Sequence, residues 1–266
     1  MQNIVAQLVH TSQSRAGVFF IQSNRKGILF LWDNLFDLFL PKQYHDLQEG
    51  GVTVHIFLIR HGESMANVGK NYVDRIPDHL VALTEKGIKQ ANDAGVWLAE
   101  YCQEHEIRLD NARIWRSPYC RTRQTSEEFN ASLNIKDVRE DITLIEQQFG
   151  LFDSVSEKQW GVLFPKEYDE YQRQRQNYGR FYARLPLGES PFDVAIRIHQ
   201  FMGTIHRDYE KHGVDTLFVF THGTTLRAFL LRWFHYSPEW FHEERNPQNC
   251  WIREIKGHED CGYINL

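Results

Sequence analysis

The chain has 266 residues, of which 42% are hydrophobic and 14% aromatic, and this is enough apolar material for one sizeable core. A formal net charge of −5 and the lack of a dominant basic patch disfavour nucleic acid as a partner. The four cysteines form neither a C-x-x-C pair nor a zinc-type Cys/His spacing, so we expect reduced thiols and a cytoplasmic location.

Residues 1–50 are expected to form an N-terminal extension whose role the sequence does not define. Its start lacks the basic residues and the continuous apolar run of a signal peptide. The most apolar part, within residues 27–40, is too short to span a bilayer and is interrupted by Asp33 and Asp37. The sequence therefore predicts no transmembrane segment. An accessory piece packed on the main domain is the simplest interpretation, and a membrane-surface or partner-binding role is the alternative.

Residues 51–266 are predicted to form the catalytic domain, because strand and helix patterns alternate along them. A short apolar run at 54–59 is typical of a buried strand, and Thr84 is a candidate helix cap. The apolar stripe of the helix after Thr84 is expected to contain Ile88, Ala91, Gly95, Leu98 and Cys102. This alternation predicts an α/β fold, a three-layer sandwich in which helices flank a mostly parallel central sheet.

The remaining elements follow the same alternation. Extended segments are expected at 112–115, around Val138, at 142–145, at 217–220 and at 250–255, the last as an edge strand. Helices are expected after Pro118, over 190–210 and over 224–234, and a helical excursion off the core is expected around 155–187.

Two segments share one design, in which a buried strand delivers a His-Gly pair at its carboxyl end. The first reads Arg60-His61-Gly62-Glu63-Ser64, and the second reads Thr221-His222-Gly223-Thr224-Thr225. Ligands bind at this edge of open α/β sheets. A glycine lets the backbone approach a ligand, and a helix start after it offers free N–H groups to an anion. If the two strands are neighbours, the imidazoles of His61 and His222 converge on one point.

A metal ion and a phosphate are the two candidates for that point. Arg60 stands beside His61, and a guanidinium disfavours a bound cation. It matches phosphate oxygens instead, because its N–H donors are forked and permanently charged. A third segment at 116–125 places Arg121 on the first turn of a helix that follows another strand. We therefore expect an anion site with neither metal nor cofactor.

The three segments together resemble the histidine phosphatase superfamily, also called phosphoglycerate mutase-like. The resemblance rests on Arg-His-Gly-Glu-Ser at 60–64 with Asn67 three positions later, on Ser-Pro-x-x-Arg-x-x-Gln-Thr at 117–125, and on His222-Gly223. It covers roughly residues 52–255. The order and spacing of all three motifs make it specific, since Arg-His-Gly alone is weak.

The resemblance implies a role for each matching residue. His61 matches the nucleophile, and the phosphate pocket is matched by Arg60, Arg121, His222 and, as a supporting contact, Asn67. Glu146 matches the proton donor, which sits in a similar Leu-x-Glu-x-x-x-Gly setting. Neighbouring acids remain as alternatives for the proton donor: Glu140, Asp141 and Asp153. Candidate substrate contacts are Ser64, Arg75, Gly223 and Thr224.

The resemblance implies a metal-independent phosphatase that hydrolyses a phosphomonoester through a phosphohistidine intermediate. Gly223 stands where the acid phosphatase branch would carry Asp, which favours the branch with an upstream glutamate. The expected substrate is a small phosphorylated molecule, with a phosphoprotein as an alternative. Phosphoglycerate mutase-type phosphoryl transfer and a phosphate-binding regulatory pseudo-enzyme are the competing functions. The oligomeric state and the particular substrate are not specified by the sequence.

Overall fold

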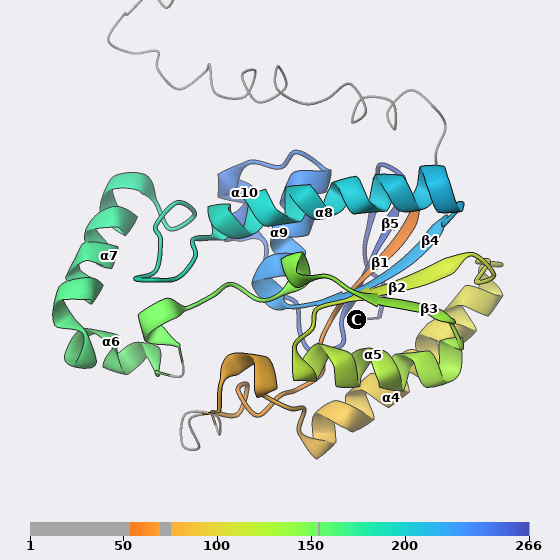
Figure 1. Ribbon diagram of the computed structural model, residues 1–266, viewed down its shortest axis with the longest axis horizontal. Helices are drawn as coiled ribbons and strands as arrows, with labels where there is room; N and C mark the ends of the chain where they lie inside the picture. The colour runs from red at the N-terminus through yellow and green to blue at the C-terminus, as the bar shows by residue number, and fades with distance from the viewer. Residues whose placement is uncertain (1–53, 70–75, 154, 266) are drawn as a thin grey trace, which may run out of the picture. The chain divides into compact units, whose positions relative to one another are not determined.

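The computed structural model describes residues 54–69, 76–153 and 155–265 (Figure 1). The chain divides into two units, Met1–Gly51 and Val52–Leu266, and the fold described here is that of the second unit. The expected extension over residues 1–50 and the candidate substrate contact Arg75 lie outside the described residues. Within the described ranges, no helix is both long and apolar enough to cross a membrane.

Six strands form one sheet in the order β3-β2-β4-β1-β5-β6. Their bounds are β1 His55–Arg60, β2 Ala112–Arg116, β3 Asp137–Glu140, β4 Thr216–Thr221, β5 Ile252–Lys256 and β6 Glu259–Tyr263. The first four in chain order pair in parallel, and β5 and β6 are antiparallel, which confirms a mostly parallel sheet. The expectation of an edge strand at 250–255 is wrong, because β5 pairs with both β1 and β6, and β6 forms the edge.

Helices cover both faces of this sheet, so the three-layer sandwich is confirmed (Figure 1). One face carries α4 (Glu85–Glu104) and α5 (Cys120–Leu133), and the other carries α8 (Pro191–His212) and α9 (Gly223–Trp233), with α10 (Pro238–Glu243) beside α9. Two further helices, α6 (Glu157–Leu163) and α7 (Pro165–Tyr178), stand away from the sheet. Short 3-10 helices are η2 Asp78–Leu80, η3 Ile142–Leu144 and η4 Gly150–Phe152.

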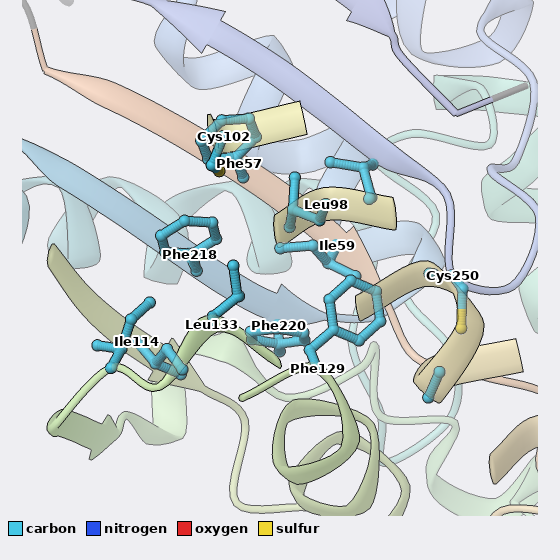
Figure 2. Close-up of a cluster of buried hydrophobic side chains, with 14 of the residues drawn as sticks. Phe57, Ile59, Leu98, Cys102, Ile114, Phe129, Leu133, Phe218, Phe220 and Cys250 are labelled. Carbon is cyan, nitrogen blue, oxygen red and sulfur yellow. The ribbon is translucent and has the colours of Figure 1, made fainter. Parts of the chain in front are cut away.

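The layer between the sheet and α4 and α5 is packed with aromatic and aliphatic side chains (Figure 2). The rings of Phe57 on β1 and Phe218 on β4 stack with centroids 5.0 Å apart. Phe129 on α5 meets Phe220 on β4 edge to face at 5.1 Å. Since offset and edge-to-face ring pairs add stability beyond their buried area, these contacts fix α5 against the strand that carries the second motif.

Two local predictions are wrong for identifiable reasons. The side chain of Ile88 is 38% exposed, because Gly87 takes the inward position on α4, where a Cβ would lie 2.0 Å from the carbonyl oxygen of Glu63. The extended segment expected at 142–145 is instead the 3-10 helix η3. There the carboxylate of Asp141 accepts a hydrogen bond from the backbone N–H of Thr143 (2.8 Å), which favours a turn over a strand.

Candidate active site

The two His-Gly motifs meet at the carboxyl ends of neighbouring strands. Strands β1 and β4 pair in parallel with Arg60 opposite Thr221, and the backbone N–H of His61 donates to the carbonyl of Thr221 (3.1 Å). The ring centroids of His61 and His222 therefore lie 5.2 Å apart at an interplanar angle of 62°. Both side chains are buried. The structure thus brings together the two imidazoles that the sequence placed at one point.

One hydrogen bond determines which nitrogen of His61 can react. Its Nδ1 lies 2.7 Å from the carbonyl oxygen of Gly62, and since a carbonyl can only accept, Nδ1 must carry the proton. In the neutral imidazole, Nε2 then keeps its lone pair. Burial, and then the positive charges of Arg121 and Arg60, hold the pKa of His61 well below its usual value. A pKa in that direction favours the neutral ring at neutral pH.

The second imidazole is oriented by the middle motif. Nε2 of His222 lies 2.9 Å from the hydroxyl oxygen of Ser117, a fully buried residue of the Ser-Pro segment. The other ring nitrogen, Nδ1, is buried without a hydrogen-bond partner among the described residues. Burial is also the main reason that the pKa of His222 is well below its usual value, with the charge of Arg121 next. An unpartnered nitrogen in this position is available to a ligand.

The two arginines have different partners. The guanidinium of Arg60 donates to the carbonyl of Pro247, while its Nε is buried and unpartnered within the described part of the chain. The guanidinium of Arg121 binds Asp78 through both carboxylate oxygens, at 2.8 and 3.1 Å, and through the backbone carbonyl at 2.7 Å. Asp78 thus accepts three of the five N–H donors of Arg121, which leaves at most two for an anion.

Glu146 lies at the N-terminus of α9, next to the second motif. Its carboxylate accepts from the backbone N–H of Thr224 at 3.3 Å, and a carboxylate oxygen lies 3.4 Å from the hydroxyl of Thr225. The loop that carries Glu146 is held by Arg197 on α8, which donates to the carbonyl of Glu146 (3.2 Å) and pairs with Glu189 (2.9 Å).

The acids near Glu146 in sequence have other surroundings. Glu140 forms ion pairs with Arg123 (2.6 Å) and Arg116 (3.0 Å). It lies at the end of β3, and β2 separates this strand from β4, which carries the second motif. Asp141 caps η3. Asp153 lines a pocket described below. Of the four candidate proton donors, Glu146 contacts the residues that directly follow His222.

The segment after the first motif differs from the sequence prediction. Residues 63–69, the described part of this segment, form no helix. Ser64 forms an isolated bridge with Leu83 and is fully buried, and the side-chain oxygen of Asn67 accepts from the backbone N–H of Ser64 (3.0 Å). Asn67 therefore braces this loop through its oxygen. Asn249 joins it, donating to the carbonyl of His61 (3.0 Å) and to the side chain of Asn67 (3.2 Å).

Neighbouring atoms approach the glycines of both motifs closely, from the backbone at Gly62 and from a side chain at Gly223. A Cβ on Gly62 would lie 2.6 Å from the carbonyl oxygen of Gly87, and a Cβ on Gly223 would lie 2.2 Å from the side-chain oxygen of Asn246. The backbone N–H of Gly62 also donates to the hydroxyl of Thr125 on α5 (3.0 Å). These contacts lock the strand ends to α4, α5 and the segment after α10, and so fix the directions of the two imidazoles.

A pocket of 240 Å³ adjoins this cluster and is lined, among the described residues, by Pro77, Asp78, His79, Tyr119, Gln148, Phe149, Gly150 and Asp153. Tyr119 connects the pocket to the cluster, because its ring lies 5.2 Å from that of His222 and 5.0 Å from the guanidinium of Arg121. No group of three His, Cys, Asp or Glu side chains within the described ranges is arranged to hold a metal ion.

Sequence reasoning missed four residues that support the site: Asp78, Arg197, Asn246 and Asn249. Each reaches the site from a segment without a motif, and only the folded chain brings them to the two histidines. Arg197 is held at the site by its ion pair with Glu189, which precedes α8.

The fold and this cluster define an α/β protein with paired histidines at the ends of adjacent parallel strands. A family model described as histidine phosphatase superfamily (branch 1) matches residues 56–266, and the chain belongs to this superfamily. It is 34% identical over 219 residues to the phosphoglycerate mutase-like protein AT74 of Arabidopsis thaliana, covering 76% of this chain and 64% of that protein's length. It is 25% identical to the broad-range acid phosphatase DET1 of Saccharomyces cerevisiae, covering 73% and 82%.

Solved structures share the fold at lower identity. The alpha-ribazole phosphatase from Shigella flexneri superimposes with a TM-score of 0.59 at 21% identity, over 76% of this chain and 89% of the other. A mycobacterial glucosyl-3-phosphoglycerate phosphatase gives a TM-score of 0.56 at 20% identity, over 76% and 92%.

Proposed function

We propose that this protein is a metal-independent phosphatase that hydrolyses a phosphomonoester through a phosphohistidine intermediate on His61. The observation that carries the proposal is the pair of buried imidazoles 5.2 Å apart, with Nδ1 of His61 held by the carbonyl of Gly62. This arrangement leaves the lone pair of Nε2 for attack on phosphorus. The relatives named as phosphatases support the same reaction class.

In the proposed reaction, Nε2 of His61 forms a bond to phosphorus as the bond to the leaving oxygen breaks. Arg60, Arg121 and His222 hold the non-bridging oxygens and balance their charge as it redistributes. The unpartnered Nε of Arg60 and Nδ1 of His222 are suitable donors for this purpose when protonated. Fixed cationic side chains would then supply the charge stabilisation that a metal ion supplies in other phosphatases.

Glu146 is the proposed proton donor. In its protonated form it gives its proton to the leaving oxygen, and as a carboxylate it then takes a proton from the water that cleaves the phosphohistidine. The second step returns His61 and releases inorganic phosphate, so Glu146 regains the proton it gave. Its position beside Thr224 and Thr225, at the start of the helix that follows His222, supports this role.

The test is phosphate release from p-nitrophenyl phosphate by the full chain. The H61A variant should lose nearly all turnover, and an exposed-histidine control, H212A, should keep it. Rapid acid-free quenching with ³²P-labelled substrate should trap an acid-labile, alkali-stable phosphoenzyme in the wild-type protein and none in H61A. Turnover that persists in H61A, or that is lost on adding a chelator, would contradict the proposal.

A further inference from the structure

The backbone of Ser117 is held between two elements of the site. Its N–H donates to the carbonyl of Phe220 on β4 (3.0 Å), and its carbonyl accepts from the hydroxyl of Thr122 on α5 (3.0 Å). Phe220 lies on the strand that directly precedes His222, and both Ser117 and His222 are fully buried. These contacts keep the hydroxyl of Ser117 in one position beside the second imidazole.

The contacts of this hydroxyl determine the direction of its hydrogen bond to His222. The described residues give it two partners, which are Nε2 of His222 at 2.9 Å and the backbone N–H of Tyr119 at 3.3 Å. An N–H can only donate, so the oxygen of Ser117 accepts from Tyr119. The hydroxyl hydrogen then has Nε2 of His222 as its acceptor. With a proton on Nε2, this buried hydroxyl would lack an acceptor among the same residues, which is unfavourable.

This direction places the proton of the second ring. A neutral imidazole carries one N–H, and since Nε2 of His222 accepts from Ser117, the proton is on Nδ1. Burial, followed by the charge of Arg121, holds the pKa of His222 well below its usual value, which favours the neutral ring. Nδ1 is buried and has no hydrogen-bond partner in the described part of the chain. It is therefore a donor that a bound anion would satisfy.

The first ring differs in what it leaves free. Nδ1–H of His61 donates to the carbonyl of Gly62 (2.7 Å), and Nε2 keeps its lone pair. Both rings thus have their proton on Nδ1, yet His61 leaves a lone pair free and His222 leaves an N–H free. A lone pair can attack phosphorus, whereas an N–H can only donate to a phosphate oxygen. The hydrogen bonds therefore distinguish two histidines that have the same place in their His-Gly motifs.

We propose that Ser117 is a positioning residue that holds His222 with its proton on Nδ1, so that His222 donates to a phosphate oxygen and His61 acts as the nucleophile. The inference rests on the proposed phosphatase function and adds a residue to it. In this role Ser117 acts through His222, whose ring nitrogen is the group that contacts the phosphate.

Nuclear magnetic resonance of the ¹⁵N-labelled full chain reads the proton positions without turnover. Two-bond ¹H–¹⁵N correlations distinguish a protonated ring nitrogen from one with a lone pair, and spectra of H61N and H222N assign the two rings. At pH 7.5 we expect the proton of His222 on Nδ1. In S117A it should move in part or wholly to Nε2, because the donor to Nε2 is removed. A wild-type His222 with its proton on Nε2, or on both nitrogens, would overturn the inference.

Binding of inorganic phosphate tests whether this proton position matters at the site. Calorimetry should give an affinity about 3–10-fold lower for S117A than for wild type, the effect expected of one hydrogen bond. The kcat/KM for p-nitrophenyl phosphate should fall by at least the same factor. S126A is the matched control, because Ser126 is another buried serine, whose hydroxyl donates to the carbonyl of Arg123 and accepts from Arg116. S126A should keep the wild-type phosphate affinity and the proton of His222 on Nδ1.

The two proposals fail on different results. An unchanged phosphate affinity in folded S117A would overturn the role of Ser117, even if p-nitrophenyl phosphate is hydrolysed. If S117A does not fold, the wild-type spectrum decides, since a proton on Nδ1 of His222 supports the inference and a proton on Nε2 overturns it. Absence of all phosphatase activity in the wild-type protein would overturn the proposed function instead, and the ring spectra would still report on Ser117.

Discussion

At the scale of single residues, the proposed chemistry depends on imidazoles that are buried and have defined hydrogen bonds. The Nδ1–H of His61 donates to the carbonyl oxygen of Gly62, and Nε2 of His222 is hydrogen-bonded to the hydroxyl of Ser117. Each ring therefore keeps one nitrogen for a ligand. Burial and the charges of Arg121 and Arg60 oppose protonation of both rings. The arginines therefore carry the positive charge of the cluster, and Nε2 of His61 keeps a free lone pair.

The role of Glu146 gives a prediction at this scale. E146Q keeps the size of the side chain and its acceptor oxygen toward Thr224 but removes the titratable proton. Because a positioned proton donor contributes about 10²–10⁴-fold, kcat for an alkyl phosphate should fall by that factor. The loss should be smaller for p-nitrophenyl phosphate, whose leaving group needs less protonation.

The matched control is E140Q, since Glu140 is the neighbouring acid with surface ion pairs to Arg116 and Arg123. Exposed ion pairs contribute about 0–1 kcal/mol to stability, so the fold should survive their loss. Since Glu140 has no proposed part in the reaction, kcat should stay within about twofold of wild type. A large loss in E140Q together with normal turnover in E146Q would move the proton donor to Glu140.

Motifs in the sequence pointed to the candidate reactive residues, but they did not point to the residues that contact them in the fold, and the reason is physical. His61 and His222 each directly precede a glycine at the end of an apolar strand, Arg60 directly precedes His61, and this pattern is visible along the chain. Asp78 contacts Arg121 across 43 positions, and Arg197 contacts Glu146 across 51. Such long-range contacts depend on how elements pack, and no local pattern in the sequence encodes them.

At the scale of elements, helix α8 supports the loop that carries Glu146. The guanidinium of Arg197 donates to the carbonyls of Thr143 and Glu146 and pairs with Glu189, so it joins η3 and the Glu146 loop to α8 and to the segment just before it. R197Q should break these bonds and let the loop move. We expect kcat to fall by about tenfold with a smaller change in KM, and the free energy of unfolding to fall by about 1–3 kcal/mol.

R207Q on the exposed side of the same helix is the control, because Arg207 bonds only to the nearby Thr204 among the contacts described. R197K distinguishes the hydrogen-bonding geometry of Arg197 from its charge, because lysine keeps the positive charge but lacks the forked N–H donors of a guanidinium. If R197Q lowers stability while kcat keeps its wild-type pH profile and magnitude, Arg197 has a purely structural role.

The junction between the first motif and α4 gives a second prediction at this scale. In G87A the new methyl group would meet the carbonyl oxygen of Glu63 at 2.0 Å, and backbone cannot yield as a flexible side chain can. The loop after His61 would have to shift. We expect a loss of about 1–3 kcal/mol in unfolding free energy, measured by urea denaturation, together with reduced turnover.

N92A, at an exposed position on the same helix, is the control. It should leave stability unchanged or slightly higher, because alanine has the best helix propensity. A G87A protein as stable and as active as wild type would show that the close packing of Gly87 against Glu63 is not needed to place His61.

At the scale of the whole molecule, the site exists because β1 and β4, far apart in sequence, are adjacent and parallel. The alternation of strands and helices predicted a mostly parallel sheet, yet the strand order β3-β2-β4-β1-β5-β6 could not be derived from it. Order depends on which helix faces bury which sheet face, as in the contacts of α4 with α5 and of α8 with α9. The resemblance of the motifs implied the convergence of His61 and His222, which periodicity alone left open.

Placing two neutral imidazoles inside the fold has a consequence for stability as a function of pH. In the unfolded chain a histidine has a pKa near 6.5, whereas burial and nearby arginines hold the pKa values of His61 and His222 well below that. Between the two values the unfolded state binds more protons, so the free energy of unfolding falls as the pH drops below about 6.5. Above that pH both states are neutral and these residues add no pH dependence.

Urea denaturation of the full chain at pH 7.5, 6.5 and 5.5 measures the effect. Each fully buried histidine contributes a slope of up to about 1.4 kcal/mol per pH unit below pH 6.5. Replacing one of them, in H61N or H222N, should lower that slope by up to this amount, while the exposed control H212N should keep the wild-type slope. A slope in H61N and H222N equal to that of wild type would mean that both rings accept protons in the folded protein, and the neutral nucleophile on which the proposed reaction depends would be lost.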